Sequence, residues 1–139
     1  MATPRQQLRQ LGVPDAMIDT ATISGKPLVV IEANKEEMNP WDRMNKTEAL
    51  YAADLEYAES VGEITAWRFE PIKFRLAKAT YYTPDFMVIR QGQTLEFVEI
   101  KGFLRDDAAV KYKMLRELFP WFAYRMLRRI KKEWVEVNI

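Results

Sequence analysis

Hydrophobic residues recur at helical spacing in two stretches of the chain. Over residues 46–61 the apolar positions fall on one side of a helix. A second helix is predicted from Asp106 or Asp107, either of which can act as the N-cap, to about Leu118, before Pro120. The core-facing residues expected from these patterns are Leu50, Ala53, Tyr57 and Val61 in the first helix, and Ala108, Tyr112, Leu115 and Phe119 in the second.

Alternating apolar and polar residues predict strands elsewhere after residue 62. They lie at about 64–69, 72–77, 85–90, 95–101, 122–129 and 133–138. We expect the first four to form an antiparallel meander, with Gln91-Gly92 as a tight turn between the last two of them. The order of helix, strands, helix and strands predicts an α/β (α+β) fold, in which a mixed β-sheet is flanked by helices.

The first part of the chain has a less regular pattern. It predicts a short helix over residues 4–11, a second helical piece beginning near Pro14, a strand over residues 28–31 and a polar linker over residues 32–43. We therefore expect a short helical N-terminal extension over residues 1–43 and a main domain over residues 44–139.

Composition narrows the functions that this fold can carry. A chain of 139 residues with 48% hydrophobic content suits one domain with modest appendages. The 21 basic and 20 acidic residues leave a net charge near +1, so any affinity for nucleic acid must come from local clusters of charge. The N-terminus lacks the apolar run of a signal peptide, and no apolar stretch approaches membrane-spanning length. We expect a cytosolic protein without a membrane partner.

Two residue types are missing from the sequence. The chain has no cysteine, which excludes disulfides, thiolate zinc sites and cysteine nucleophiles. It also has no histidine, which excludes Ser-His-Asp hydrolases, His-ligated zinc and histidine-centred nucleases. What remains is chemistry built on carboxylates, lysine and hard metal ions.

Such a set of residues lies at the ends of two predicted strands. Glu99 and Lys101 are two positions apart, so their side chains share one face of the strand. In a hairpin that turns around Gly92, Asp85 lies roughly opposite Glu99, because each is seven residues from that glycine. Asp85 and Glu99, with the carbonyl of Ile100, can hold Mg²⁺ through oxygen, with Mn²⁺ as the alternative metal. Lys101 can orient water or stabilise a charged transition state.

Pro84-Asp85 followed by Glu99-Ile100-Lys101 resembles the PD-(D/E)XK signature of restriction-like endonucleases, exonucleases and phage junction resolvases. The likeness covers about residues 44–137 and extends to small phage and prophage proteins of that superfamily. The segments that carry it are Asn45-Lys46-Thr47-Glu48, Glu70-Pro71-Ile72, Tyr82-Thr83-Pro84-Asp85-Phe86, Glu99-Ile100-Lys101-Gly102 and Arg105-Asp106-Asp107-Ala108.

The resemblance implies a restriction-endonuclease-like core made of a helix, three meandering strands, a helix and a further strand. It also implies DNA cleavage with Mg²⁺ to leave a 5′-phosphate, without a covalent intermediate. In many members a glutamate on the first core helix adds a metal contact, and Glu48 is the matching position here. The alternative reading of Glu48 is structural, because Asn45 and Glu48 are spaced as a capping box.

Basic and aromatic residues supply further candidates. Arg105, Lys111, Lys113 and Arg116 could hold backbone phosphates, and a densely basic run follows at Arg125, Arg128, Arg129, Lys131 and Lys132. A solvated surface explains both sets about as well. The four tryptophans, Trp41, Trp67, Trp121 and Trp134, could stack on unpaired bases, although aromatic residues in strands more often belong to the core. Glu70 could join the acidic site, but we favour a solvent-facing position.

These observations favour a Mg²⁺-dependent DNA endonuclease of phage or prophage origin, which acts in the cytosol of the host cell. One alternative is a Holliday-junction resolvase, which should act as a homodimer to present two active sites to a symmetric junction. Another is a DNA-binding module that keeps the fold without turnover. Residues 1–40 match nothing that we can name. They are candidates for an arm that docks a phage or host replication or recombination protein, or for a part of the core.

Overall fold

The structure is a computed structural model of the whole chain. It describes residues 39–92, 94–102 and 105–139, together with Gln6, Arg9, Gln10 and the backbone of residues 22–23, 26–27 and 29–31. Gln6, Arg9 and Gln10 are helical, within the helix expected over residues 4–11. The helical piece expected near Pro14 and the linker up to residue 38 lie outside the described residues.

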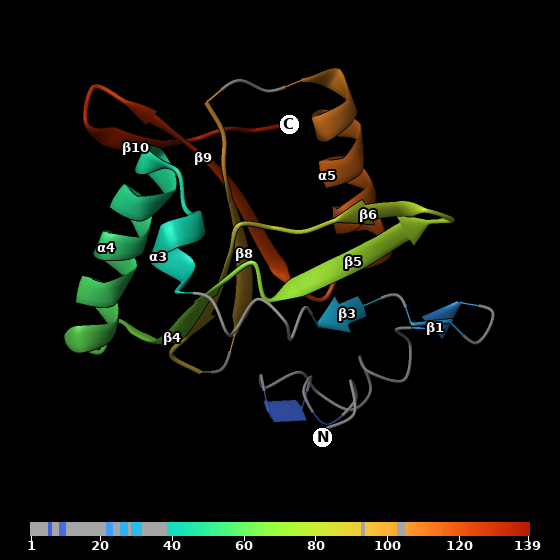
Figure 1. Cartoon of the computed structure of the whole chain (residues 1–139), viewed down its shortest axis with the longest axis horizontal. Coiled ribbons are helices and arrows are strands. Elements are labelled where there is room, and N and C mark those ends of the chain that lie inside the picture. The colour runs from blue at the N-terminus through green and yellow to red at the C-terminus, as the bar shows by residue number, and fades with distance from the viewer. Residues whose placement is uncertain are drawn as a thin grey trace.

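A mixed five-stranded sheet forms the centre of the molecule (Figure 1). Its strands lie in the order β10-β9-β8-β7-β4, and all neighbours are antiparallel except β8 and β9, which are parallel. A parallel pair needs a crossover, and α5 supplies it. The bounds are β4 (Ile64–Phe69), β7 (Phe86–Arg90), β8 (Leu95–Ile100), α5 (Asp106–Leu118), β9 (Ala123–Ile130) and β10 (Glu133–Glu136). The α+β class with a mixed sheet is confirmed.

The two faces of this sheet carry separate apolar clusters. On one face α4 (Lys46–Ser60) packs through Tyr51, Ala52 and Leu55 on residues such as Phe86 and Val98. On the other face α5 packs through Tyr112 and Leu115, and β5 (Ile72–Ala77) adds Phe74 to the same cluster. Figure 1 shows α4 and α5 on opposite sides of the sheet. The sheet is therefore buried from both faces.

The expected meander of four strands is wrong in one respect. β4 pairs with β7 and β7 with β8, but β5 leaves the main sheet and pairs with β6 (Thr80–Tyr82) and β3 (Val29–Ile31) in a smaller sheet. The departure occurs at Glu70-Pro71, where Glu70 has a positive φ of 48° and proline lacks the N–H that a ladder needs. A further two-stranded sheet joins β1 (Thr22–Ile23) to β2 (Lys26–Pro27).

The face of α4 that meets the core also differs from the expectation. Leu50, Tyr57 and Val61 are 43%, 67% and 50% exposed, and Ala53 is exposed as well. The helix has apolar residues on two sides, and the side with Tyr51, Ala52 and Leu55 packs on the sheet. Ala52 is fully buried, since a methyl side chain lets the helix approach the large aromatic residues of the sheet.

The starts of two helices differ from the sequence prediction. Arg105, and not Asp106 or Asp107, occupies the N-cap of α5, and both aspartates lie in the first turn, where they favour the positive end of the helix dipole. Within the expected linker, α3 (Pro40–Arg43) forms a single helical turn, because Pro40 starts it and the Asn39 side chain accepts a hydrogen bond of 3.1 Å from the Trp41 N–H.

The predicted boundary near residue 44 stays a prediction. Two side chains from the N-terminal side of it, Trp41 and Arg43, contact Trp67 and Glu70 of the main domain. None of the helices among the described residues is long and apolar enough to cross a membrane.

Candidate metal-binding site on the β7–β8 hairpin

Asp85 and Glu99 face each other at the open end of the β7–β8 hairpin. The strands pair with Phe86 opposite Val98, so the next positions outward are Asp85 and Glu99, as the spacing from Gly92 indicated. Gly92 has a φ of +84°, a conformation that glycine adopts without steric cost and that the tight connection requires. The register of the hairpin therefore brings the two carboxylates together.

Reciprocal hydrogen bonds hold the pair in place. The Ile100 N–H donates to Asp85 Oδ2 at 2.8 Å, and the Asp85 N–H donates to Glu99 Oε2 at 3.2 Å. Lys101 Nζ lies 3.1 Å from Glu99 Oε1, with its side chain 27% exposed. Each carboxylate is thus anchored to the neighbouring strand, and the lysine reaches the pair from the rim. The structure brings together all three residues expected at the catalytic centre.

The site holds more negative charge than its surroundings offset. Burial, and then the charge of Glu99, raise the pKa of Asp85 to about 8. Burial also raises the pKa of Glu99, against the opposing effect of Lys101, and its side chain is only 7% exposed. Two buried carboxylates with one lysine are short of positive charge, and a proton or a metal cation can supply it.

The donor set fits a hydrated Mg²⁺ ion. Within the described part of the chain, no three His, Cys, Asp or Glu side chains converge closely enough to hold a metal ion by themselves. Mg²⁺ commonly uses one or two carboxylates and fills its remaining positions with water and substrate phosphate. Asp85 and Glu99, with the Ile100 carbonyl beside them, meet that pattern.

Glu48 lies near this pair but serves the helix cap. Its backbone N–H donates to Asn45 Oδ1 at 2.8 Å, and its carboxylate accepts the Asn45 N–H at 3.3 Å, which completes a capping box. Burial raises the pKa of Glu48, and the charges of Glu70 and Lys101 also act on it, which places it close to the site. The capping interpretation is what the structure shows, and Glu48 as a third ligand stays a prediction.

Glu70 does not simply face solvent. Its carboxylate accepts a hydrogen bond of 3.0 Å from Arg43, and its side chain is 26% exposed. Its backbone N–H donates to the Asp85 carbonyl at 2.7 Å. The guanidinium of Arg43 lies 5.1 Å from the centre of the Phe69 ring. Glu70 therefore ties the end of β4 to Asp85 at the border of the acidic site.

Tyr82 is a site residue that the sequence did not single out. It belongs to the smaller sheet, and its side chain is buried against the carboxylate pair. Burial, followed by the charges of Glu99 and Asp85, raises the pKa of the Tyr82 hydroxyl. The hydroxyl makes no hydrogen bond of good geometry within the described residues. Tyr82 precedes Asp85 by three residues and is held in β6 by its pairing with Phe74 of β5, and no local sequence pattern predicts that pairing.

Glu96 is a second buried carboxylate that the sequence did not single out. It lies on β8, and its side chain accepts a hydrogen bond of 2.9 Å from Arg90 and lies 3.7 Å from Arg125. Since side chains alternate along a strand, Glu96 points to the α4 face of the sheet and Glu99 to the opposite face. The two glutamates therefore belong to different environments.

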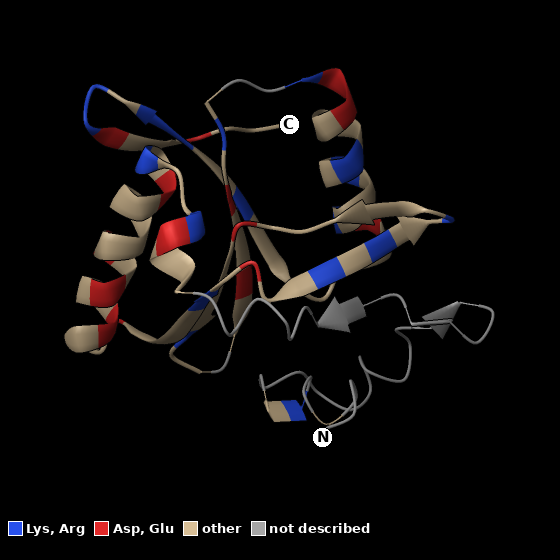
Figure 2. Cartoon of the chain, in the orientation of Figure 1, with Lys and Arg blue, Asp and Glu red and all other residues tan. Residues whose placement is uncertain are grey.

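The basic residues expected to contact DNA fall into two groups. Arg105 is the N-cap of α5 and Lys111 and Lys113 lie in the middle of that helix, and all three are exposed or half-exposed. Lys131, at the turn of the β9–β10 hairpin, is exposed, whereas Arg129 stacks on Trp134 at 4.7 Å. Figure 2 shows basic residues at both places, on the side of the molecule where β8 ends.

The other basic candidates differ in their exposure and contacts. Arg128 and Lys132 are exposed. Arg125 pairs with Glu96 and Glu136. Arg116 donates to the Ile139 carbonyl and lies over the Tyr112 ring.

The tryptophans are mostly structural. Trp67 is buried, Trp41 packs edge-on against it, and the Trp134 indole N–H donates to Asp54 at 2.8 Å. Trp121 is 49% exposed and is the member of this set best placed to stack on a base.

Comparison with known proteins gave no match. No family model, no curated protein and no solved structure matches the chain. The functional interpretation therefore rests on the residues and the geometry described above.

Proposed function

We propose that the chain is a Mg²⁺-dependent DNA endonuclease of the PD-(D/E)XK type. The observation that carries the proposal is the convergence of Asp85, Glu99 and Lys101 at one end of a hairpin, in surroundings short of positive charge. The order of elements supports it as well. α4, the antiparallel strands β4, β7 and β8, then α5 and the parallel β9 follow the order expected for that superfamily, with β5 and β6 inserted after β4.

The protein's own residues would divide the work in a simple way. Asp85 and Glu99 would hold the metal ion, with the Ile100 carbonyl as a further oxygen. A bound Mg²⁺ or Mn²⁺ would lower the pKa of a coordinated water and offset the charge that develops on the scissile phosphate. Lys101, which is already in contact with Glu99, donates to the attacking water or to a phosphate oxygen. Exposed basic residues on α5 and on the β9–β10 hairpin would hold the DNA backbone.

One assay tests this function directly. The purified chain is incubated with supercoiled plasmid, linear duplex, single-stranded DNA and a four-way junction, in Mg²⁺, Mn²⁺ or EDTA. We expect cleavage that requires the metal and is lost in Asp85→Ala. A matched control is Asp107→Ala, which removes an exposed aspartate from the first turn of α5 and should cleave normally.

The outcomes separate the alternatives. Cleavage in EDTA, or unchanged cleavage by Asp85→Ala, would refute the proposed mechanism. Preferred cleavage of the four-way junction by a dimer would identify a resolvase. DNA binding without cleavage under every condition would identify a binding module of the same fold.

A further inference from the structure

Arg128 lies beside Lys101 in the main sheet. The parallel strands β8 and β9 pair with Ile100 opposite Leu127, and the Lys101 N–H donates to the Leu127 carbonyl at 2.9 Å. The next residues along the two strands are Lys101 and Arg128. The register therefore places an arginine one strand away from the lysine of the acidic site.

Arg128 also points to the face of the sheet that carries this site. Glu99 lies opposite Met126, which belongs to the apolar cluster between the sheet and α5. Because side chains alternate along a strand, the residues two positions further, Lys101 and Arg128, point to the same face as this pair. Arg129 points to the α4 face, where it lies over a tryptophan ring. Of these two successive arginines, only Arg128 shares the face of the site.

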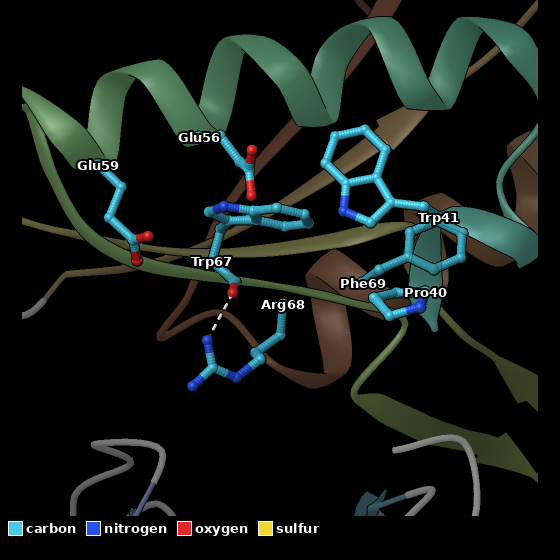
Figure 3. Close-up of a pocket in the computed structure, with 7 residues that line it drawn as sticks. All are labelled: Pro40, Trp41, Glu56, Glu59, Trp67, Arg68 and Phe69. Atoms are coloured by element: carbon cyan, nitrogen blue, oxygen red, sulfur yellow. Dashed lines mark hydrogen bonds between the residues drawn. The ribbon is translucent and has the colours of Figure 1, made fainter. Parts of the chain in front are cut away.

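Arg128 has no partner within the described residues. Its side chain is exposed, and it forms no hydrogen bond, ion pair or ring contact there. The other arginines of the main sheet are engaged. Figure 3 shows one of them, Arg68, which donates to the Trp67 carbonyl at 2.8 Å. The rest contact a glutamate or a tryptophan, and they are Arg90, Arg125 and Arg129.

Apolar residues flank Arg128 on its face of the β9–β10 hairpin. Val135 lies directly opposite it on β10 and is 41% exposed, and Ile130, two residues further along β9, is 42% exposed. Glu133 lies opposite Ile130, and it forms no ion pair in the described part of the chain. The guanidinium of Arg128 can therefore take an anion from outside the chain.

The place of Arg128 suits a phosphate group. Adjacent strands are about 4.8 Å apart, so Arg128 starts one strand spacing beyond Lys101, on the side away from Asp85. A guanidinium group can donate two parallel hydrogen bonds to the oxygens of one phosphate, and such charged bonds are roughly twice as strong as neutral ones. A DNA strand that crosses the site from β7 toward β9 would bring its next phosphate to this arginine.

We propose that Arg128 binds the DNA backbone phosphate next to the scissile one and so positions the strand over Asp85 and Glu99. This inference rests on the proposed function and deepens it, because it assigns the substrate contact beside Lys101 to Arg128 and not to Arg129. A phosphate contact carries no base information, so its contribution is the same for every DNA sequence.

DNA binding in EDTA tests this contact without cleavage. The full chain is titrated into labelled duplexes of unrelated sequence over a range of KCl concentrations, and fluorescence anisotropy gives Kd. Arg128→Ala should raise Kd roughly tenfold for each duplex. It should also reduce the slope of log Kd against log salt concentration by about one, because one phosphate contact is lost. Arg128→Lys keeps the charge and should retain most of the slope.

The matched control is Arg68→Ala, which removes an exposed arginine from β4, at the far edge of the same sheet. It should bind with the Kd and the slope of the natural chain, and Arg129→Ala should change the slope less than Arg128→Ala does. The Tm of each variant shows that it is folded.

The outcomes distinguish this contact from the nuclease function. A slope for Arg128→Ala equal to that of Arg68→Ala or Arg129→Ala, or a natural chain that binds no DNA, would overturn the inference. A loss of affinity for a poly-glutamate peptide but not for DNA would also overturn it, and would assign Arg128 to an acidic polypeptide. If the predicted slopes are found and the natural chain never cleaves DNA in Mg²⁺, the nuclease function fails and the phosphate contact stands.

Discussion

Glu96 and Glu99 lie on the same strand and have similarly buried side chains, at 10% and 7% exposed, yet their surroundings differ in charge. Glu96 has two guanidinium groups near its carboxylate, from Arg90 and Arg125. Glu99 has one lysine and shares its space with a second carboxylate, that of Asp85. Burial alone therefore does not mark a functional carboxylate. What distinguishes Glu99 is a local shortage of positive charge, which a metal cation would remove.

The largest expected effect is on catalysis. Glu99→Gln should reduce the rate of Mg²⁺-dependent DNA cleavage by about 100-fold or more, because it removes a proposed metal ligand and the partner of Lys101. Glu96→Gln should change that rate by no more than a few-fold, since its carboxylate points to the opposite face. Single-turnover cleavage of a labelled duplex measures both. If the two variants lose activity equally, the distinction between the two glutamates fails.

Stability should respond in the opposite sense. Glu96→Gln removes the buried negative charge that pairs with Arg90 and Arg125, and we expect the free energy of unfolding to fall by about 1–3 kcal/mol. Glu99→Gln removes a buried negative charge from a site that is short of positive charge, so in EDTA it should leave the free energy of unfolding unchanged or raise it. Urea unfolding followed by tryptophan fluorescence is the measurement. A larger loss of stability in Glu99→Gln than in Glu96→Gln would argue for a purely structural Glu99.

The pH dependence of stability should show whether Asp85, in the Asp85–Glu99 pair, is protonated in the folded chain. The pKa of Asp85 is raised from an ordinary value of 3.8 to about 8, so between these values the folded chain holds a proton that the unfolded chain has lost. The contribution of Asp85 to stability is therefore present at low pH and is lost as pH rises toward 8. In EDTA the free energy of unfolding should fall more steeply over this range in the natural chain than in Asp85→Asn.

The effect of Mg²⁺ on Tm provides a control for this pH dependence of the free energy of unfolding. At pH 8 the ion should raise the Tm of the natural chain and of Asp107→Asn, because a ligand that binds the folded state stabilises it. It should leave the Tm of Asp85→Asn almost unchanged. Identical pH slopes for the natural chain and Asp85→Asn would show that Asp85 is not protonated in the folded state.

The smallest effect is expected at Tyr82. Tyr82→Phe removes a buried hydroxyl that makes no hydrogen bond of good geometry, so stability should change by less than about 1 kcal/mol. Urea unfolding in EDTA measures this directly. A loss well above that value would show that the hydroxyl does bond to Glu99 and helps to balance the pair.

Sequence information was sufficient for the hairpin of the site. Gly92 fixed the turn, and alternation along the strands fixed the faces, so the meeting of Asp85 with Glu99 and Lys101 followed from local rules. The core face of α5 was likewise correct for Tyr112, Leu115 and Phe119, since its apolar residues lie mainly on one side.

Other features depend on contacts that local rules do not encode. Both sides of α4 carry apolar residues, and only the bulk of the sheet beneath it decides that Ala52 and Leu55 face inward while Leu50 and Tyr57 do not. The contact of Tyr82 with the site depends on where β5 and β6 pack. The separation of Glu96 from Glu99 depends on arginines from two other strands, which strand alternation cannot locate.

The parallel pairing of β8 with β9 has a consequence for the order of folding. Asp85 and Glu99 are 14 residues apart in the chain and meet within one hairpin, whereas β9 reaches β8 only after α5 has been traversed. Hairpins form in about 1–10 μs, and contacts across longer loops form later. The carboxylates therefore approach each other before the rest of the sheet is complete. A divalent cation that screens them at that stage should accelerate refolding, and stopped-flow refolding with and without Mg²⁺ would measure this.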